Sequence, residues 1–240
     1  MALQSEKLTA IQSKLSTQNL PTGINILLHG SPGTGKTEMV HQLARKTGRP
    51  LMKVNVAETK SCWHGESEKM ILAVFQDYEK MLNSEKIAPI LFFNEADAIL
   101  GKRLSVQRSI DQTTNAVQNI LLEQLEKMNG IFIATTNLTD NLDQAFQRRF
   151  LFKVNVERPD QETRRRIWES KLPQLPKSHI KQIADRYELS GGEIDNIVRK
   201  IIMDDILGES EISLERLIEY CSLESGNGLH KQTKIGFTIS

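Results

Sequence analysis

The 240-residue sequence has few cysteines, few aromatic residues and no excess of charge of either sign. Its two cysteines, Cys62 and Cys221, lie far apart and make no metal-binding pattern, which indicates reduced thiols in the cytoplasm. There is no H-E-x-x-H motif, so a fused zinc protease is excluded. The formal net charge is only +1, so no overall field draws the protein towards nucleic acid or a membrane surface.

Long hydrophobic runs and a signal peptide are also missing from the sequence. No apolar stretch reaches the roughly 20 residues of a membrane span, and the first 20 residues are polar and mildly amphipathic. Hydrophobic residues make up 39% of the chain and charged residues 25%, as in ordinary soluble proteins. We therefore expect a cytoplasmic protein with a real hydrophobic core and with neither a membrane nor nucleic acid as a partner.

Residues 30–37, with the sequence GSPGTGKT, carry the strongest chemical signal in the chain. They fit the pattern G-x-x-x-x-G-K-T of the phosphate-binding loops of nucleotide hydrolases. An apolar run over 24–28 predicts a buried strand before the loop, and helical spacing from Met39 predicts a helix after it. The glycines let backbone N–H groups face phosphate oxygens, and the helix N-terminus adds its positive dipole.

In this setting Lys36 would reach the β- and γ-phosphates, and the Thr37 hydroxyl would ligate Mg²⁺. The sequence thus predicts a nucleoside triphosphate and Mg²⁺ as cofactors. The candidate cofactor-binding residues of the loop are Ser31, Pro32, Gly33, Thr34, Gly35, Lys36, Thr37 and Glu38.

Apolar runs alternate with helical patterns up to residue 156, which predicts an α/β layer with a parallel sheet flanked by helices. Helices are expected near 7–15, after the loop, over 66–82 and around 117–128, with Gly130 ending the last of them. The polar stretch 101–112 is expected to be a loop. The predicted strands cover residues 24–28, 51–56, 89–93, 131–135 and 151–156.

After residue 159 the pattern is helical only, near 160–170, 178–187, 192–207 and 213–222, which predicts a small all-helical domain. We expect an N-terminal extension over 1–22, a nucleotide-binding α/β domain over 23–158, a helical lid over 159–223 and a C-terminal tail over 224–240.

Several further segments occur in an informative order. The strand 89–93 ends in Asn94 and Glu95, and is preceded by WHGESE at 63–68. It is followed by ATTN at 134–137, LDQAFQRRF at 142–150 and SGG at 190–192. Together with the phosphate loop, these segments resemble the AAA+ ATPases, and within them the AAA group of protein remodellers. The resemblance covers about residues 23–223 and implies a P-loop NTPase fold with a helical lid.

The resemblance implies a role for each segment. Glu95 would be the catalytic glutamate that polarises the attacking water, and Asn137 would be the amide that senses the γ-phosphate or that water. Arg148 and Arg149 would be arginine fingers that reach the nucleotide of a neighbouring subunit. A solvated carboxylate, a turn-forming amide and a basic helix end are the structural alternatives for these positions.

Two further parts of the resemblance concern the lid and the substrate. Gly191 and Gly192 would lie over the base and ribose, although capping of a helix would also explain them. Trp63 and His64 would line the pore of a hexamer, where the flat indole grips an extended polypeptide. A tryptophan that anchors its loop on the core, beside an ordinary loop histidine, is the alternative.

Position 94 departs from the family pattern, which has Asp where this chain has Asn. Asn94 keeps one carbonyl acceptor but loses the charge that helps to hold the Mg²⁺ shell. We expect ATP to bind still, with Thr37 and Asn94 at the metal, and hydrolysis to be slowed. The prediction is a hexameric, Mg²⁺-dependent ATPase that remodels polypeptides. A nucleotide-gated assembly module with little hydrolysis is the alternative, and a DNA-associated AAA+ ATPase is a weaker one.

Overall fold

The computed structural model describes residues 5–56, 67–102, 109–138, 142–207 and 213–226. The chain forms two compact units. The first contains residues 1–30 and 36–156, and the second contains residues 31–35 and 157–240. The short segment 31–35, which is the middle of the phosphate-loop motif, therefore packs with the C-terminal helices.

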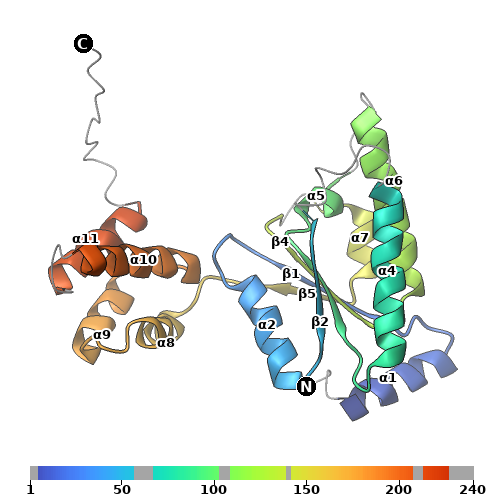
Figure 1. Cartoon of the computed structure of the whole chain (residues 1–240), viewed down its shortest axis with the longest axis horizontal. Helices are drawn as coiled ribbons and strands as arrows, with labels where there is room; N and C mark the ends of the chain where they lie inside the picture. Colours follow the sequence, from blue (N-terminus) through green and yellow to red (C-terminus); the bar gives the residue numbers. More distant parts are fainter. Residues whose placement is uncertain (1–4, 57–66, 103–108, 139–141, 208–212, 227–240) are drawn as a thin grey trace. The chain divides into compact units, whose positions relative to one another are not determined.

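The first unit is built on a five-stranded parallel sheet in the order β2-β3-β4-β1-β5 (Figure 1). All five strands lie where the apolar runs predict them, and the α/β fold class is confirmed. The central strands β3 and β4 are buried along their whole length, as expected for parallel strands covered on both faces. The strands are β1 (Ile24–His29), β2 (Leu51–Asn55), β3 (Ile90–Asn94), β4 (Ile131–Thr136) and β5 (Phe152–Asn155).

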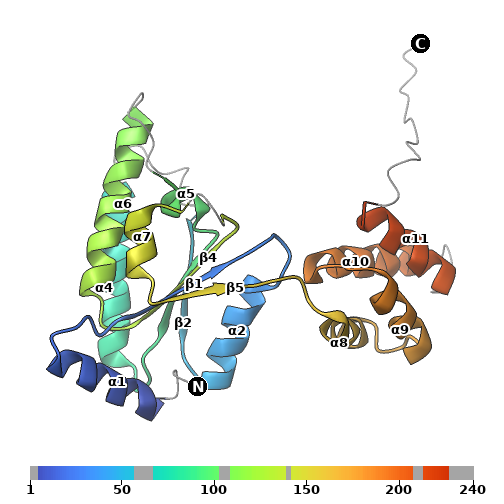
Figure 2. The same cartoon turned by 180° about the vertical axis from the view of Figure 1, so that it is seen from behind.

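Helices cover both faces of this sheet (Figures 1 and 2). Alternate strand residues point to opposite faces, so Phe92 packs in the cluster with Val40 of α2. Phe93 and Phe132 pack on the other face, with side chains of α4 and α6. The helices of this unit are α1 (Ser5–Thr17), α2 (Lys36–Thr47), α4 (Ser67–Ser84), α5 (Asp97–Leu100), α6 (Ser109–Lys127) and α7 (Gln144–Arg149).

Two local predictions for this unit were wrong. Helix α6 begins at Ser109, so residues 109–112 of the expected loop 101–112 are helical, because a mostly polar first turn can extend a helix that packs through its later turns. The same helix ends at Lys127, before Gly130. A Cβ at Gly130 would lie 2.1 Å from the Tyr78 hydroxyl oxygen, so this glycine makes room for a buried tyrosine.

The second unit is helical, as predicted, and has its own core. Trp168, Ile183, Ile197 and Leu217, one from each helix, are fully buried together. Among the residues described in either unit, no helix is both long and apolar enough to cross a membrane. The helices in the described part of this unit are α8 (Gln161–Lys171), α9 (Lys177–Arg186), α10 (Gly191–Leu207) and α11 (Leu214–Glu224).

Candidate functional site

The phosphate loop follows the carboxyl end of β1. Gly30, Gly33 and Gly35 have φ angles of 142°, 76° and 92°. Residues with a side chain rarely adopt such positive φ angles. Lys36 is the first residue of α2. Its Nζ donates to the Gly30 carbonyl oxygen at 2.9 Å. Burial lowers the pKa of Lys36, and the charge of Asp97 opposes that shift. A buried cation at the start of a helix suits an anionic ligand.

Within the second unit, segment 31–35 packs closely against the start of α10. The Gly192 N–H donates to the Gly33 carbonyl oxygen at 3.0 Å. A Cβ on Gly33 would lie 2.8 Å from Ser190 Oγ, and one on Gly192 would lie 3.1 Å from the Gly33 Cα. Gly191 also faces this segment, since its Cβ would lie 3.4 Å from the Gly33 carbonyl oxygen. These glycines therefore allow two backbones to approach.

Capping of α10 is done by other residues, which the sequence analysis missed. Ser190 Oγ accepts from the Glu193 N–H at 3.2 Å, and a Glu193 carboxylate oxygen accepts from the Ser190 N–H at 2.6 Å. This reciprocal pair is a capping box, and its signal is the S-x-x-E spacing of 190–193. Gly191 and Gly192 are thus not needed as caps.

Back in the first unit, Asn94 accepts hydroxyl donors on the α2 face of the sheet. Its Oδ1 accepts from Thr37 Oγ1 at 2.8 Å and from Thr135 Oγ1 at 3.2 Å. Because the Thr37 hydroxyl donates to Asn94, its lone pairs remain for a cation. The amide thus reproduces part of what a carboxylate would do at position 94, without the charge.

Glu95 follows in a strained turn at the carboxyl edge of the sheet. Its φ angle is 53°, a left-handed conformation that costs a non-glycine residue on the order of 1 kcal/mol. Thr135 holds the turn: its Oγ1 accepts from the Glu95 N–H at 3.1 Å, and its carbonyl oxygen accepts from the Ala96 N–H at 2.8 Å. The Glu95 side chain is exposed, as a group that meets a ligand must be.

Asn137 lies at the end of the neighbouring strand, held by Asp97. The Asp97 carboxylate accepts from the Asn137 N–H at 2.9 Å and from Asn137 Nδ2 at 3.3 Å. It also accepts from the Thr136 hydroxyl. No role of Asp97 could be predicted from the sequence, because its partners are about 40 residues away along the chain.

The two predicted arginine fingers are placed differently by α7. Asp143 caps this helix by accepting from the Ala145 N–H, and both arginines lie in its last turn. Arg149 forms an ion pair with Glu126 of α6 in its own chain. The Arg148 side chain is exposed and makes no hydrogen bond or ion pair with any described residue.

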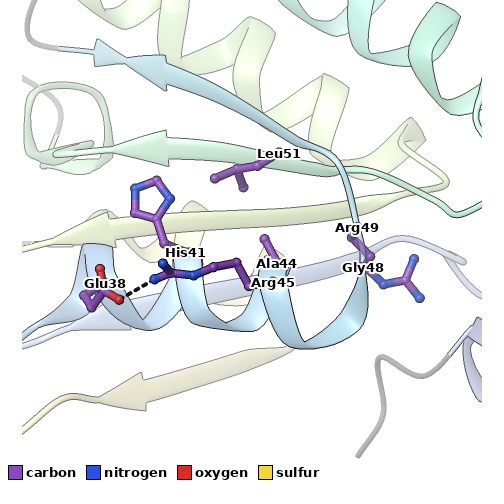
Figure 3. A pocket seen from close by; sticks show the side chains of 7 residues that line it. All are labelled: Glu38, His41, Ala44, Arg45, Gly48, Arg49 and Leu51. Atoms are coloured by element: carbon purple, nitrogen blue, oxygen red, sulfur yellow. Dashed lines mark hydrogen bonds and ion pairs between the residues drawn. The ribbon is translucent and has the colours of Figure 1, made fainter.

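The remaining predicted residues lie away from this edge or outside the described part of the chain. Trp63 and His64 fall outside the described residues. Glu38 pairs with Arg45 on the outer side of α2, where Figure 3 shows both side chains with His41 beside them. They line a shallow pocket of about 470 Å³ in the first unit, and the rest of its lining is Ala44, Gly48, Arg49 and Leu51.

Taken together, the side chains at the carboxyl edge fit a magnesium nucleotide. Lys36 supplies a buried positive charge, and the Thr37 hydroxyl supplies an oxygen ligand. Among the described residues, no cluster of His, Cys, Asp and Glu could hold a metal by itself. A cation here would therefore share its coordination between Thr37 and phosphate oxygens, as Mg²⁺ does in many nucleotide sites.

Comparisons with known proteins agree with this geometry. The family described as "ATPase family associated with various cellular activities (AAA)" matches residues 26–158. Vacuolar protein sorting-associated protein 4 of Dictyostelium discoideum is 26% identical over 206 residues, which are 80% of this chain and 44% of that protein. The 26S proteasome regulatory subunit 6B homolog of Saccharomyces cerevisiae is 32% identical over 214 residues, or 82% of this chain and 48% of that protein.

A solved structure, the FIGL-1 AAA domain in complex with ADP, has the same fold. It superposes with a TM-score of 0.68 at 20% identity, covering 92% of this chain and 78% of that one. The chain spans less than half the length of the two curated relatives named above. Activities and partners of those longer proteins therefore do not transfer to it directly.

Proposed function

Because the chain belongs to the AAA family of ATPases, we propose that it binds ATP with Mg²⁺ and hydrolyses it to ADP and phosphate. The observation that carries this proposal is the meeting of four side chains at the carboxyl edge of one sheet. Lys36 and Thr37 follow β1 through the loop, Glu95 follows β3 and Asn137 follows β4. Ligands of open parallel sheets bind outside this edge.

Each residue has one task in this reaction. Lys36 neutralises phosphate charge, and the Thr37 hydroxyl would hold Mg²⁺, which would supply further positive charge to the phosphate oxygens. Glu95 accepts a hydrogen bond from the attacking water and orients it towards the γ-phosphorus. Asn137 contacts the same water. Backbone N–H groups of the phosphate loop would face the phosphate oxygens, and the resemblance to the AAA group implies that Gly191 and Gly192 lie near the base and ribose.

Asn94 sets the rate in this proposal. A neutral amide beside Thr37 attracts the cation less than a carboxylate would, so turnover is slow while ATP binding persists. The alternative function, a nucleotide-gated assembly module, also rests on Asn94. If this residue makes hydrolysis too slow to matter, ATP binding alone would control assembly.

The test is phosphate release from ATP and Mg²⁺ by the wild type and by the Glu95→Gln and Asn94→Asp variants. We expect turnover in the wild type, at least about a 100-fold loss in Glu95→Gln and a gain in Asn94→Asp. Glu79→Gln is the matched control, because Glu79 is an exposed glutamate of α4 in the same unit. A silent wild type that binds ATP and is revived by Asn94→Asp would favour the assembly module.

We further propose that the chain works as a ring in which Arg148 of one subunit completes the nucleotide site of its neighbour.

 The support is the exposed position of this side chain at the end of α7. Lys36→Ala and Arg148→Ala should each be nearly inactive alone. Mixed in equal amounts they should regain activity, because a Lys36→Ala subunit still lends its arginine to an intact neighbouring site. A mixture no more active than the sum of its parts would argue against a shared site.

The substrate we propose is an extended polypeptide gripped by Trp63 and His64 in the pore of a hexamer. Trp63→Ala should then abolish unfolding of a tagged test protein while ATP turnover stays within about twofold of wild type. Unchanged unfolding would exclude this role for Trp63. DNA stimulation that weakens steeply with salt would instead favour the DNA-associated alternative. A cytoplasmic location remains our proposal.

A further inference from the structure

Both carboxylate oxygens of Asp97 accept hydrogen bonds from residues at the end of β4. One oxygen, Oδ1, accepts from the Asn137 N–H at 2.9 Å and from the Thr136 hydroxyl. The other, Oδ2, accepts from Asn137 Nδ2 at 3.3 Å. All three donors thus belong to two consecutive residues at the end of one strand.

These contacts determine which way the Asn137 amide faces. A carboxylate can only accept hydrogen bonds, so the side of the amide that faces Asp97 must be its NH₂ group. The carbonyl oxygen Oδ1 of Asn137 then lies on the side of the amide away from Asp97. Asn137 is exposed, so this oxygen remains available to a ligand at the carboxyl edge of the sheet.

A purely structural role for Asp97 as a helix cap does not account for these contacts. Asp97 is the first residue of α5, and the N-cap position of that helix is Ala96, which makes no side-chain cap hydrogen bond. The Asp97 carboxylate instead accepts hydrogen bonds from Thr136 and Asn137, at the end of the neighbouring strand β4. Its charge also favours the protonated form of Lys36.

We propose that Asp97 is a positioning residue, which fixes the Asn137 amide so that its carbonyl oxygen faces the water activated by Glu95. Asp97 acts only through Asn137 and does not touch the reacting atoms. The kinetic part of this inference rests on the proposed ATPase function. The orientation of the amide does not, and it can be tested separately.

The first test observes the Asn137 side-chain NH₂ group by ¹⁵N NMR, with its signal identified by its loss in Asn137→Ala. In Asp97→Asn we expect this signal to shift and its hydrogens to exchange with water several-fold faster, because a charged acceptor has been removed. Asp77→Asn, which makes the same change on the exposed side of α4, should leave the signal in place. An unchanged Asn137 signal in Asp97→Asn would overturn the proposal.

The second test is a double-mutant cycle on ATP turnover. Asp97→Asn should lower kcat about tenfold and leave ATP affinity within about twofold. In the Asn137→Ala background the same change should have no further effect on kcat. Multiplying effects, or an equal loss of ATP affinity, would show that Asp97 does not act through Asn137.

Two further outcomes are covered by this design. If the wild type has no turnover, the proposed function fails, and the NMR signal alone decides the role of Asp97. If Asp97→Asn does not fold, Asp97→Glu keeps the charge but displaces it by one methylene group. That variant should fold, move the Asn137 signal and lower kcat, whereas an unmoved signal would again contradict the proposal.

Discussion

Strands β3 and β4 lie side by side in the core, and their two ends are completed in opposite ways. At the amino ends, the buried Tyr78 hydroxyl accepts from the Ile131 N–H at 2.9 Å and donates to the Pro89 carbonyl oxygen at 2.9 Å. At the carboxyl ends, Glu95 and Asn137 are exposed, and Glu95 has a left-handed backbone. At the amino ends, the two hydrogen bonds of the Tyr78 hydroxyl stabilise the fold, and we call them the seal. The carboxyl ends keep strained and exposed groups that a ligand can use.

The strain at the carboxyl end can be removed by Glu95→Gly, which should give the largest effect. Turnover should fall at least about 100-fold because the group that orients the water is gone. Glycine tolerates a positive φ, so Glu95→Gly should unfold with up to about 1 kcal/mol more free energy than Glu95→Ala. Urea unfolding and phosphate release measure the two quantities. Equal stability of both variants would mean that the turn stores no strain.

The seal at the amino end can be opened by Tyr78→Phe. This change leaves the Ile131 N–H and the Pro89 carbonyl oxygen buried without their partner, so we expect a loss of about 2–3 kcal/mol in the free energy of unfolding. The turnover of the folded protein should not change, because Tyr78 bonds to Pro89 and Ile131 at the amino ends of β3 and β4, opposite the predicted site. A loss of kcat at unchanged stability would contradict the division between the two ends.

Alkaline pH should weaken the same seal without a mutation. Burial raises the pKa of Tyr78 from 10.0 to about 12, so the folded state holds this proton more tightly than the unfolded state. The contribution is complete below pH 10 and is lost as the pH rises towards 12. At pH 11 the wild type should have lost about 1.4 kcal/mol more than Tyr78→Phe, relative to pH 9. Parallel urea curves at the two pH values provide the measurement.

A pair of isosteric changes compares the two faces of the carboxyl edge. The Thr135 hydroxyl donates to a neutral amide oxygen of Asn94, whereas the Thr136 hydroxyl donates to the carboxylate of Asp97. Hydrogen bonds to charged acceptors are roughly twice as strong. Thr136→Val should therefore cost about 2 kcal/mol and Thr135→Val about 1 kcal/mol of unfolding free energy. Thermal melts of the two variants give the order, and the reverse order would disprove the argument.

The sequence predicts the sheet well because each strand corresponds to a short contiguous run of apolar residues. The runs at 90–93 and 131–134 are apolar on both faces, which is typical of parallel strands covered on both sides. The phosphate loop is equally local, since its glycines, Lys36 and Thr37 are contiguous.

Other features depend on distant partners and could not be predicted in this way. Asp97 holds a residue 40 positions away, and Arg149 of α7 pairs with Glu126 of α6, which lies 23 positions earlier. Gly130 makes room for Tyr78, which lies 52 positions earlier in the chain. Hydrophobic periodicity reports on which face of an element is buried, but it does not report on which polar groups meet.

Segment 31–35 has a consequence for anyone who dissects the chain. Since it packs with the C-terminal helices, the polypeptide passes between the two units at 30/31, 35/36 and 156/157. A fragment that stops at residue 156 would keep every strand but would leave the Gly33 carbonyl without its Gly192 donor. Because the chain crosses three times, no cut at a single peptide bond separates the two units, and the phosphate loop contains residues of both.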